Sequence, residues 1–151
     1  LSPVYRYLYY RVGNEKDAED LTSQVFLKVY EELPHYHDRG QFSAWLFTIA
    51  RHKAADFFRN QKPTIALEEA DLADPAIDLL AQTVQTDEIQ RLRHLIRSLP
   101  EQEQELVRLR FVVELGYREI GGVLHRKEDA VRKSISRLLV RLQSQLEAPY
   151  E

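Results

Sequence analysis

Apolar residues recur at helical spacing through the first sixty residues of the chain. From Leu21 to Leu33 an apolar side chain follows at every fourth position, which places these side chains on one face of a helix that Pro34 ends. A second apolar stripe begins at Phe42, and a shorter apolar segment stops at Gly13. No stretch alternates with period two over the length of a strand. The pattern therefore predicts an all-helical unit.

The last sixty residues predict a helix-turn-helix. An apolar stripe over residues 92–99 closes at Pro100, a residue well placed to open the next helix. Further on, a short helix over residues 118–124, a three-residue break and a longer helix with apolar positions as far as Leu146 follow one another. Short helix, tight turn and longer helix are the order of that motif, and Gly121 fits the small-residue position where its two helices approach closely.

The distribution of charge separates these two units. Residues 64–88 contain no Lys or Arg but seven acidic residues, and Pro63 and Pro75 interrupt any periodic pattern there. A segment whose charged residues are all acidic is typical of a linker, although an ordinary solvated acidic loop has the same composition. We therefore expect an all-α protein of two small helical domains, residues 1–63 and 89–151, joined by a flexible acidic linker over 64–88.

Composition limits what the chain can do. Its 151 residues suffice for one ordinary domain or two small ones. The net charge of -3 gives no overall attraction to nucleic acid, so any such binding depends on local patches. The chain has no Cys, which excludes a disulfide framework and a thiol nucleophile and suits a reducing compartment.

The chain shows no segment suited to a membrane. The longest stretch without a charged residue, 40–50, is far shorter than the roughly 20 residues of a spanning helix, and no secretory leader is visible. We therefore expect a cytoplasmic protein with no membrane insertion. Because the chain begins at Leu1 and has no Met, we also expect residues to precede it.

No pattern points to catalysis. A glycine-rich phosphate loop, a nucleophile elbow and a helical zinc motif are all missing from the sequence. His35, His37 and Asp38 form a single short cluster without the further ligands that a structural zinc site needs. We expect no catalytic residue, no metal, no cofactor and no enzymatic activity.

The last helix carries the strongest chemical signal. Basic residues outnumber Glu128 and Asp129 along it. If its apolar positions face the core, Arg132, Lys133 and Ser136 project outward from the N-terminal half, which is the part of this motif that enters the major groove. A solvated basic face on an amphipathic helix is the competing interpretation. The two acids repel phosphate, although they also suit a helix N-terminus.

Two groups of motifs resemble one protein family, the bacterial extracytoplasmic-function sigma factors. The family's second conserved region resembles Asp17-Ala18-Glu19-Asp20-Leu21-Thr22, Val25-Phe26-Leu27 and the run from Phe42 to Arg51. Its fourth region resembles Leu99-Pro100, Leu109-Arg110-Phe111, Tyr117-Arg118-Glu119-Ile120 and Ala130-Val131-Arg132-Lys133-Ser134. Any one motif is common, but the two groups occur in the family's order and cover nearly the whole chain except the linker.

The resemblance implies a partner and a function. The chain would bind core RNA polymerase, at the clamp of the largest subunit and the flap of the second largest, and direct promoter-specific initiation of transcription. The clamp surface maps to Asp17, Asp20, Leu21, Gln24 and Phe26. The family usually has Gln then Glu where this chain has Ser23 then Gln24, which leaves individual contacts open, and helix-capping acids and core apolar positions also explain this set. An anti-sigma factor that clamps the two domains, common among relatives, is a further implied partner.

The resemblance also implies two DNA surfaces. The first domain would read the minus-10 element through Tyr36, His37, Arg39, Gln41, Arg51, His52, Lys53, Arg59 and Asn60. The second would read the minus-35 element through Arg118, Arg126, Lys127, Ala130, Arg132, Lys133, Ser134, Ser136 and Arg137. His52 stands where the family often has Asn. We assign Phe42 and Trp45 to the core, because both lie on the apolar stripe.

Two other classes of protein share parts of this pattern. One is a stand-alone helix-turn-helix repressor or activator whose N-terminal helices sense a ligand or form a dimer. The other is an interaction module whose N-terminal helices dock a partner protein without touching DNA. Binding to core polymerase separates the sigma factor from both, and autonomous duplex binding separates the other two.

Overall fold

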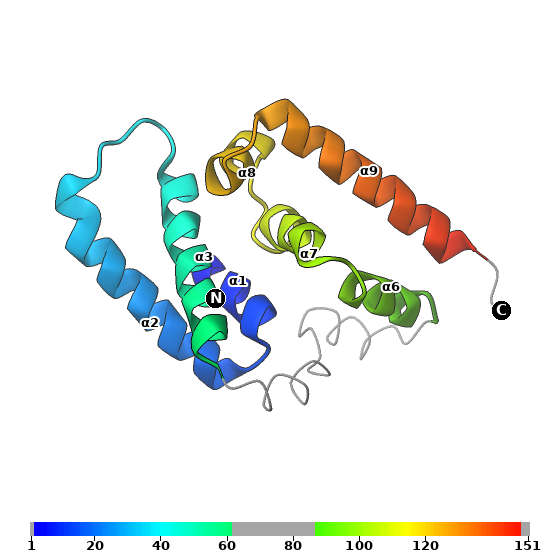
Figure 1. The fold of residues 1–151 in the computed structure, drawn as a ribbon, viewed down its shortest axis with the longest axis horizontal. Helices are drawn as coiled ribbons and strands as arrows, with labels where there is room; N and C mark the ends of the chain where they lie inside the picture. Colours follow the sequence, from blue (N-terminus) through cyan, green and yellow to red (C-terminus); the bar gives the residue numbers. More distant parts are fainter. Residues whose placement is uncertain (1, 62–86, 149–151) are drawn as a thin grey trace.

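The computed structural model describes residues 2–61, which we call the first half, and residues 87–148, the second half (Figure 1). The first half contains α1 (Pro3–Val12), α2 (Glu15–Glu32), the 3-10 turn η1 (Leu33–His35) and α3 (Phe42–Asn60). The second half contains α6 (Asp87–Arg97), α7 (Glu101–Val107), the π turn η2 (Arg108–Val112), α8 (Tyr117–Leu124) and α9 (Glu128–Glu147). The prediction of an all-helical fold with a helix-turn-helix in its second part is confirmed. The expected acidic linker lies outside the described residues apart from its last two, which open α6.

Local chemistry explains where the first helices begin and end. Gly13 closes α1 with φ of 85°, a left-handed conformation that glycine adopts without a steric penalty. Asn14 then caps α2, because its side-chain oxygen accepts a hydrogen bond from the backbone N–H of Asp17 at 2.8 Å. The α-helix ends at Glu32, two residues before Pro34, as a proline requires.

The helix-turn-helix depends on one close approach. Between α8 and α9 the chain turns over three residues, and the backbone N–H of Arg126 donates to the carbonyl of Gly121 at 2.9 Å. A Cβ at position 121 would lie 2.5 Å from the carbonyl oxygen of Arg126, closer than real Cβ contacts allow. The small-residue position predicted at Gly121 therefore corresponds to the point where the turn crosses the helix.

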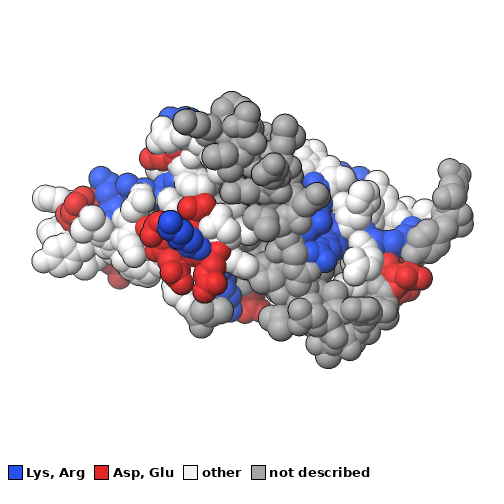
Figure 2. Space-filling view, turned by 90° about the horizontal axis from the view of Figure 1, so that it is seen from below, with Lys and Arg blue, Asp and Glu red and all other residues white. Residues whose placement is uncertain are grey.

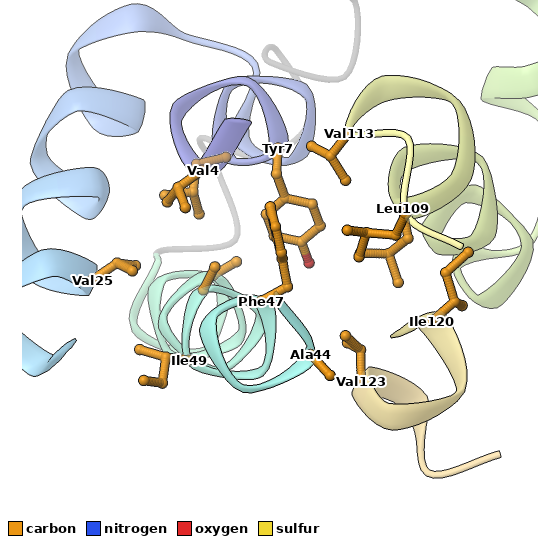
Figure 3. Close-up of a cluster of buried hydrophobic side chains, with 14 of the residues drawn as sticks. Val4, Tyr7, Val25, Ala44, Phe47, Ile49, Leu109, Val113, Ile120 and Val123 are labelled. Atoms are coloured by element: carbon orange, nitrogen blue, oxygen red, sulfur yellow. The ribbon is translucent and has the colours of Figure 1, made fainter. Parts of the chain in front are cut away.

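A single hydrophobic core joins the two halves. Figure 3 shows Tyr7 of α1 and Phe47 of α3 directed toward Leu109 of η2 and Ile120 of α8. All four side chains are buried, and the rings of Tyr7 and Phe47 meet edge to face at 5.8 Å. The sequence predicted two units with separate cores, and nothing in it indicated this shared one.

A smaller core lies at the far end of the molecule. There α6 packs against α9, where Leu138 and Leu142 are buried with Leu99. The predicted inward stripe of α9 is confirmed, because Val131 and Ile135 are also buried. Across residues 2–61 and 87–148, no helix is both long enough and apolar enough to cross a membrane.

Candidate polymerase and nucleic-acid interfaces

An aromatic cluster marks the surface expected to read the minus-10 element. The Tyr36 ring lies 4.5 Å from the Trp45 ring and 5.7 Å from the Phe42 ring, measured between centroids. Burial first, and then the Asp38 carboxylate, raise the pKa of Tyr36, so its hydroxyl stays protonated. The assignment of Phe42 to the core is wrong, since 45% of it is exposed, whereas Trp45 is partly buried against the core. Phe42 is the first residue of α3, and the buried positions of that helix begin only at Ala44.

The expected minus-10 residues fall into separate groups. Those of the loop line a hollow of about 590 Å³, the loop hollow, together with residues of the helix-turn-helix: Tyr36, His37, Arg39, Gln41, Arg118, Arg126 and Lys127. Lys53 and Asn60 instead line a different hollow beside Gln24 of α2. Arg59 is paired with Asp56, and His52 is exposed.

Arg51 does not line the loop hollow but contacts the second half of the chain. Its Nε donates a hydrogen bond to Oε2 of Glu105, in the second half of the chain, at 3.0 Å. It also lines a second hollow of about 560 Å³, the arginine hollow, with residues from α7, the turn after α8, and α9: Glu103, Glu105, Arg126, Ser134, Arg137 and Arg141. In this conformation Arg51 connects the two halves.

The expected minus-35 residues divide between an open face and these hollows. Arg132, Lys133 and Ser136 are exposed on α9. The Arg132 guanidinium lies 3.2 Å from the Asp129 carboxylate and 3.4 Å from that of Glu128, so the two acids orient it as well as partly neutralise it. The rest of the set line the two hollows between the halves, apart from the half-buried Ala130: Arg118, Arg126, Lys127, Ser134 and Arg137.

Basic side chains do not form one large surface on the face shown in Figure 2. Among the residues described there, Lys and Arg occur in small groups with Asp and Glu between them. This distribution agrees with the near-balanced composition of the chain. Attraction to DNA therefore depends on local groups such as the exposed face of α9.

All the expected clamp residues lie on α2, and all but Leu21 reach its surface. Asp20, Gln24 and Phe26 are exposed, and the Asp17 carboxylate accepts a hydrogen bond from the Asn14 side chain at 2.6 Å. Leu21 is only 3% exposed and belongs to the core, so it supports this surface from beneath.

The largest exposed apolar group of the first half runs along α2 into η1, and of its members only Phe26 was among the expected clamp residues. Phe26, Leu27, Tyr30 and Leu33 form an exposed apolar strip, which we call the α2 patch, with exposed fractions of 45% to 78%. Leu33 had been placed on the buried stripe, but it lies past the end of the helix, in η1. The sequence did contain a signal for this patch. Phe26, Leu27 and Tyr30 lie beside the buried apolar stripe, so the apolar face of this helix is wider than a helix with one buried face needs.

A buried charged network crosses between the halves at Glu105. Its Oε2 accepts hydrogen bonds from Tyr7 Oη at 2.8 Å and from Arg51 Nε at 3.0 Å, and its Oε1 accepts one from Arg108 Nε at 3.0 Å. Glu105 is 4% exposed and Arg108 is 6% exposed, and Arg108 also pairs with Glu101. The sequence indicated only that Glu105 is an acidic residue near the start of a helix.

The network raises the pKa of two of its donors, Tyr7 and Arg108. Burial first, and then the Glu105 carboxylate, raise the pKa of Tyr7 far above its usual value, so the phenol remains a donor. Burial alone lowers the pKa of Arg108, but the carboxylates of Glu105 and Glu101 outweigh it and raise the pKa overall. Tyr7 and Arg108 therefore both keep the protons that they donate to Glu105.

We expect stability to fall in alkaline solution because of Tyr7. Its pKa is raised in the folded state, so the neutral phenol contributes fully below the unfolded value of about 10 and progressively less as the pH rises beyond it. Urea unfolding of the wild type and of Tyr7→Phe at pH 8, 10 and 11 measures this contribution. The free-energy difference between the two proteins should shrink above pH 10, and a constant difference would contradict the assignment.

Comparisons with known proteins identify both halves. The family model for sigma-70 region 2 matches residues 1–64, and that for sigma-70 region 4 matches residues 89–142. The ECF RNA polymerase sigma factor SigD of Mycobacterium tuberculosis is 34% identical over 155 residues, covering 96% of this chain and 72% of SigD. BldN of Streptomyces coelicolor, also an ECF RNA polymerase sigma factor, is 33% identical over 140 residues. That match covers 85% of this chain and 50% of BldN, so the chain spans half the length of this relative.

The fold agrees with these sequence matches. CnrH, solved in complex with the cytosolic domain of CnrY, superposes with a TM-score of 0.67 at 21% identity, over 98% of this chain and 82% of CnrH. The two regions occur in the expected order with the helix-turn-helix in the second, which favours neither a stand-alone repressor nor a simple interaction module. The chain belongs to the extracytoplasmic-function sigma factors, the non-enzymatic RNA polymerase subunits that direct promoter-specific initiation of transcription.

Proposed function

We propose that this sigma factor binds core RNA polymerase through the α2 patch and reads promoter DNA with two further surfaces. The domains are residues 1–63 and 89–151, with the acidic linker over 64–88 between them, and the protein acts in the cytoplasm beside the polymerase and the chromosome. The observation that carries the proposal is the exposed α2 patch in a chain that belongs to this family.

The α2 patch has the composition of a protein interface. Exposed aromatic and aliphatic side chains lie together, and Asp20 and Gln24 are exposed on the same helix. It binds the clamp of the largest subunit. In the second half, the exposed pair Leu139 and Val140 on α9 offers apolar surface for the flap of the second largest subunit.

The two DNA surfaces differ in chemistry. On the first half, the rings of Tyr36, Phe42 and Trp45 provide faces on which unpaired bases of the minus-10 element stack, and exposed Arg39 neutralises phosphate. On the second half, Arg132 and Lys133 enter the major groove of the minus-35 duplex.

An anti-sigma factor is a further proposed partner. The related fold of CnrH was solved with the cytosolic domain of a second protein, CnrY. A partner of this kind would bind where the two halves of this chain are both within reach, and its binding would compete with the polymerase for the α2 patch.

We expect Arg132→Ala combined with Lys133→Ala to lower promoter-specific transcription by roughly 30-fold or more. Each lost base or phosphate contact weakens DNA binding by about 1–3 kcal/mol, while neither exposed side chain supports the core. The measurement is run-off transcription by reconstituted holoenzyme on promoters selected by the wild type.

A charge-matched control separates contact from net charge. Lys16→Ala with Lys28→Ala removes two charges from α2, which lies on the opposite side of the molecule from α9 (Figure 1). With equal amounts of sigma factor bound to polymerase, the control should transcribe like the wild type. Equal losses in both double variants would mean that α9 does not read the promoter, and no association of wild type with polymerase would overturn the proposed function as a whole.

A further inference from the structure

One aromatic ring of the second half lies against two arginines. Tyr117 is the first residue of α8, and the guanidinium carbons of Arg110 and Arg132 lie 4.2 Å and 5.3 Å from the centroid of its ring. Both distances are within the roughly 6 Å at which a guanidinium is attracted to the face of an aromatic ring. Tyr117 was not among the residues expected to read the minus-35 element, whereas Arg132 was. The ring therefore connects the start of α8 to the exposed face of α9.

The surroundings of Tyr117 hold its ring in place. The side chain is partly buried and packs against the main hydrophobic core. Gly116, the residue before it, caps α8, and its backbone N–H donates a hydrogen bond to the Glu119 carboxylate at 2.9 Å. Arg110, the nearer arginine, is anchored because its Nη1 donates to the backbone carbonyl of Leu115 at 3.1 Å. The ring is therefore a fixed surface against which another side chain can rest.

Arg132 has weaker support from its own helix. Its side chain is half exposed, and its carboxylate partners Glu128 and Asp129 lie one turn earlier on α9, at 3.4 Å and 3.2 Å. Both acids are exposed as well, and water competes with exposed ion pairs, so such pairs orient a side chain weakly. The Tyr117 ring adds a contact from a separate helix that is packed against the core. The ring therefore fixes a direction that the two acids alone do not.

Orientation matters for an arginine that reads DNA. An exposed Arg side chain samples many rotamers, and binding must fix one of them at a cost in conformational entropy. A bidentate contact to a guanine edge also needs the planar guanidinium in one orientation. A side chain that is held in this orientation before binding loses less freedom on binding, so its contact with the matching base pair contributes more to affinity.

We propose that Tyr117 is a positioning residue for promoter recognition: its ring orients the Arg132 guanidinium before DNA binds and so sets the base preference at the position that Arg132 reads. Tyr117 does this without a base contact of its own, and its hydroxyl is not required, because the ring face supplies the attraction. The inference rests on the proposed function, since it assumes that Arg132 reads the minus-35 element. The competing role for Tyr117 is ordinary packing against the core, which an aliphatic side chain fulfils as well.

Two substitutions separate the ring from its packing. Tyr117→Phe keeps the ring and removes only the hydroxyl, whereas Tyr117→Leu keeps an apolar side chain and removes the ring. We expect holoenzyme with Tyr117→Leu to transcribe roughly 5-fold less from a promoter selected by the wild type, and Tyr117→Phe to stay within about twofold of the wild type. An equal loss in both variants would overturn the proposal, because it would assign the effect to the hydroxyl. Tyr117→Met serves in place of the leucine variant if circular dichroism shows that the latter does not fold.

Base preference is the readout that a loss of packing would not move. Transcription by holoenzyme from a promoter library randomised over the minus-35 element gives this preference at each position. Tyr117→Leu should flatten it at the same position as Arg132→Ala and leave the other positions unchanged. The double variant should add nothing to the loss in Arg132→Ala, because the ring then has no Arg132 guanidinium to orient.

A matched control exchanges another ring of the second half for leucine. Phe111→Leu, at an exposed position of η2, should keep the wild-type preference at every position. A uniform loss of preference at all positions in Tyr117→Leu, or additive losses in its combination with Arg132→Ala, would contradict positioning and leave Tyr117 as a packing residue.

The motion of Arg132 itself can be measured without polymerase or DNA. In the free chain with isotope-labelled arginine, the NMR order parameter of the Arg132 Nε–H reports how far this group moves on the ps–ns timescale. It should be lower in Tyr117→Leu than in the wild type and in Tyr117→Phe, and equal values in all three proteins would overturn the proposal. If the values differ as expected but the wild type does not associate with polymerase, the proposed function fails while the positioning of Arg132 by the ring stands.

Discussion

Replacing Glu105 by alanine should lower the free energy of unfolding by about 3–5 kcal/mol, the usual effect of removing one partner from a buried ion pair. The carboxylate is 4% exposed and accepts hydrogen bonds from three side chains, two of which come from the other half of the chain. Without it, Arg108 keeps its charge in a buried site and Tyr7 loses the acceptor for its hydroxyl.

Urea unfolding of the whole chain measures this loss, and Glu103→Ala is its control. Glu103 lies two residues away on α7 and pairs with Arg141, but both side chains are partly exposed, so its removal should change stability by no more than about 1 kcal/mol. Equal effects of the two substitutions would show that the Glu105 network contributes no more than a surface pair. Two separate unfolding transitions in Glu105→Ala, against one in the wild type, would show that the network couples the two halves into one cooperative unit.

The second large effect should come from the α2 patch. Leu27→Ala combined with Tyr30→Ala should weaken the affinity for core polymerase by about 2 kcal/mol or more, close to 30-fold, if these side chains are the centre of the interface. Their exposed fractions are 60% and 78%, so their removal takes nothing substantial from the core. Titration of labelled sigma factor with core polymerase gives the affinity directly.

The control for this double variant is an apolar residue on another surface. Phe111→Ala removes a side chain that is 49% exposed in η2, in the second half. It should leave the affinity for polymerase within about twofold of the wild type, equivalent to less than 0.5 kcal/mol. If the α2 variant binds as tightly as the wild type while its circular dichroism is unchanged, the clamp contact lies elsewhere on the chain.

Much of the local structure was readable from the sequence. Periodicity placed the helices, Gly13 and Pro34 marked helix ends, and the order of short helix, turn and long helix identified the helix-turn-helix. These features depend on neighbours within about four residues, and the helical repeat and backbone sterics act over that range. The prediction of Gly121 belongs to the same class, because the turn that requires it is only a few residues long.

Other assignments depended on contacts between distant residues. Periodicity shows that a face is apolar, but not which surface covers it, so Phe42 was assigned to the core and is exposed, while Leu33 lies past the end of its helix. Glu105 read as a surface acid until Tyr7, 98 residues earlier in the chain, was found to donate to it. The sequence by itself determined the helices and the family. Only the tertiary structure decided that the halves share one core, because shape and charge complementarity between surfaces far apart in the chain leave no local pattern.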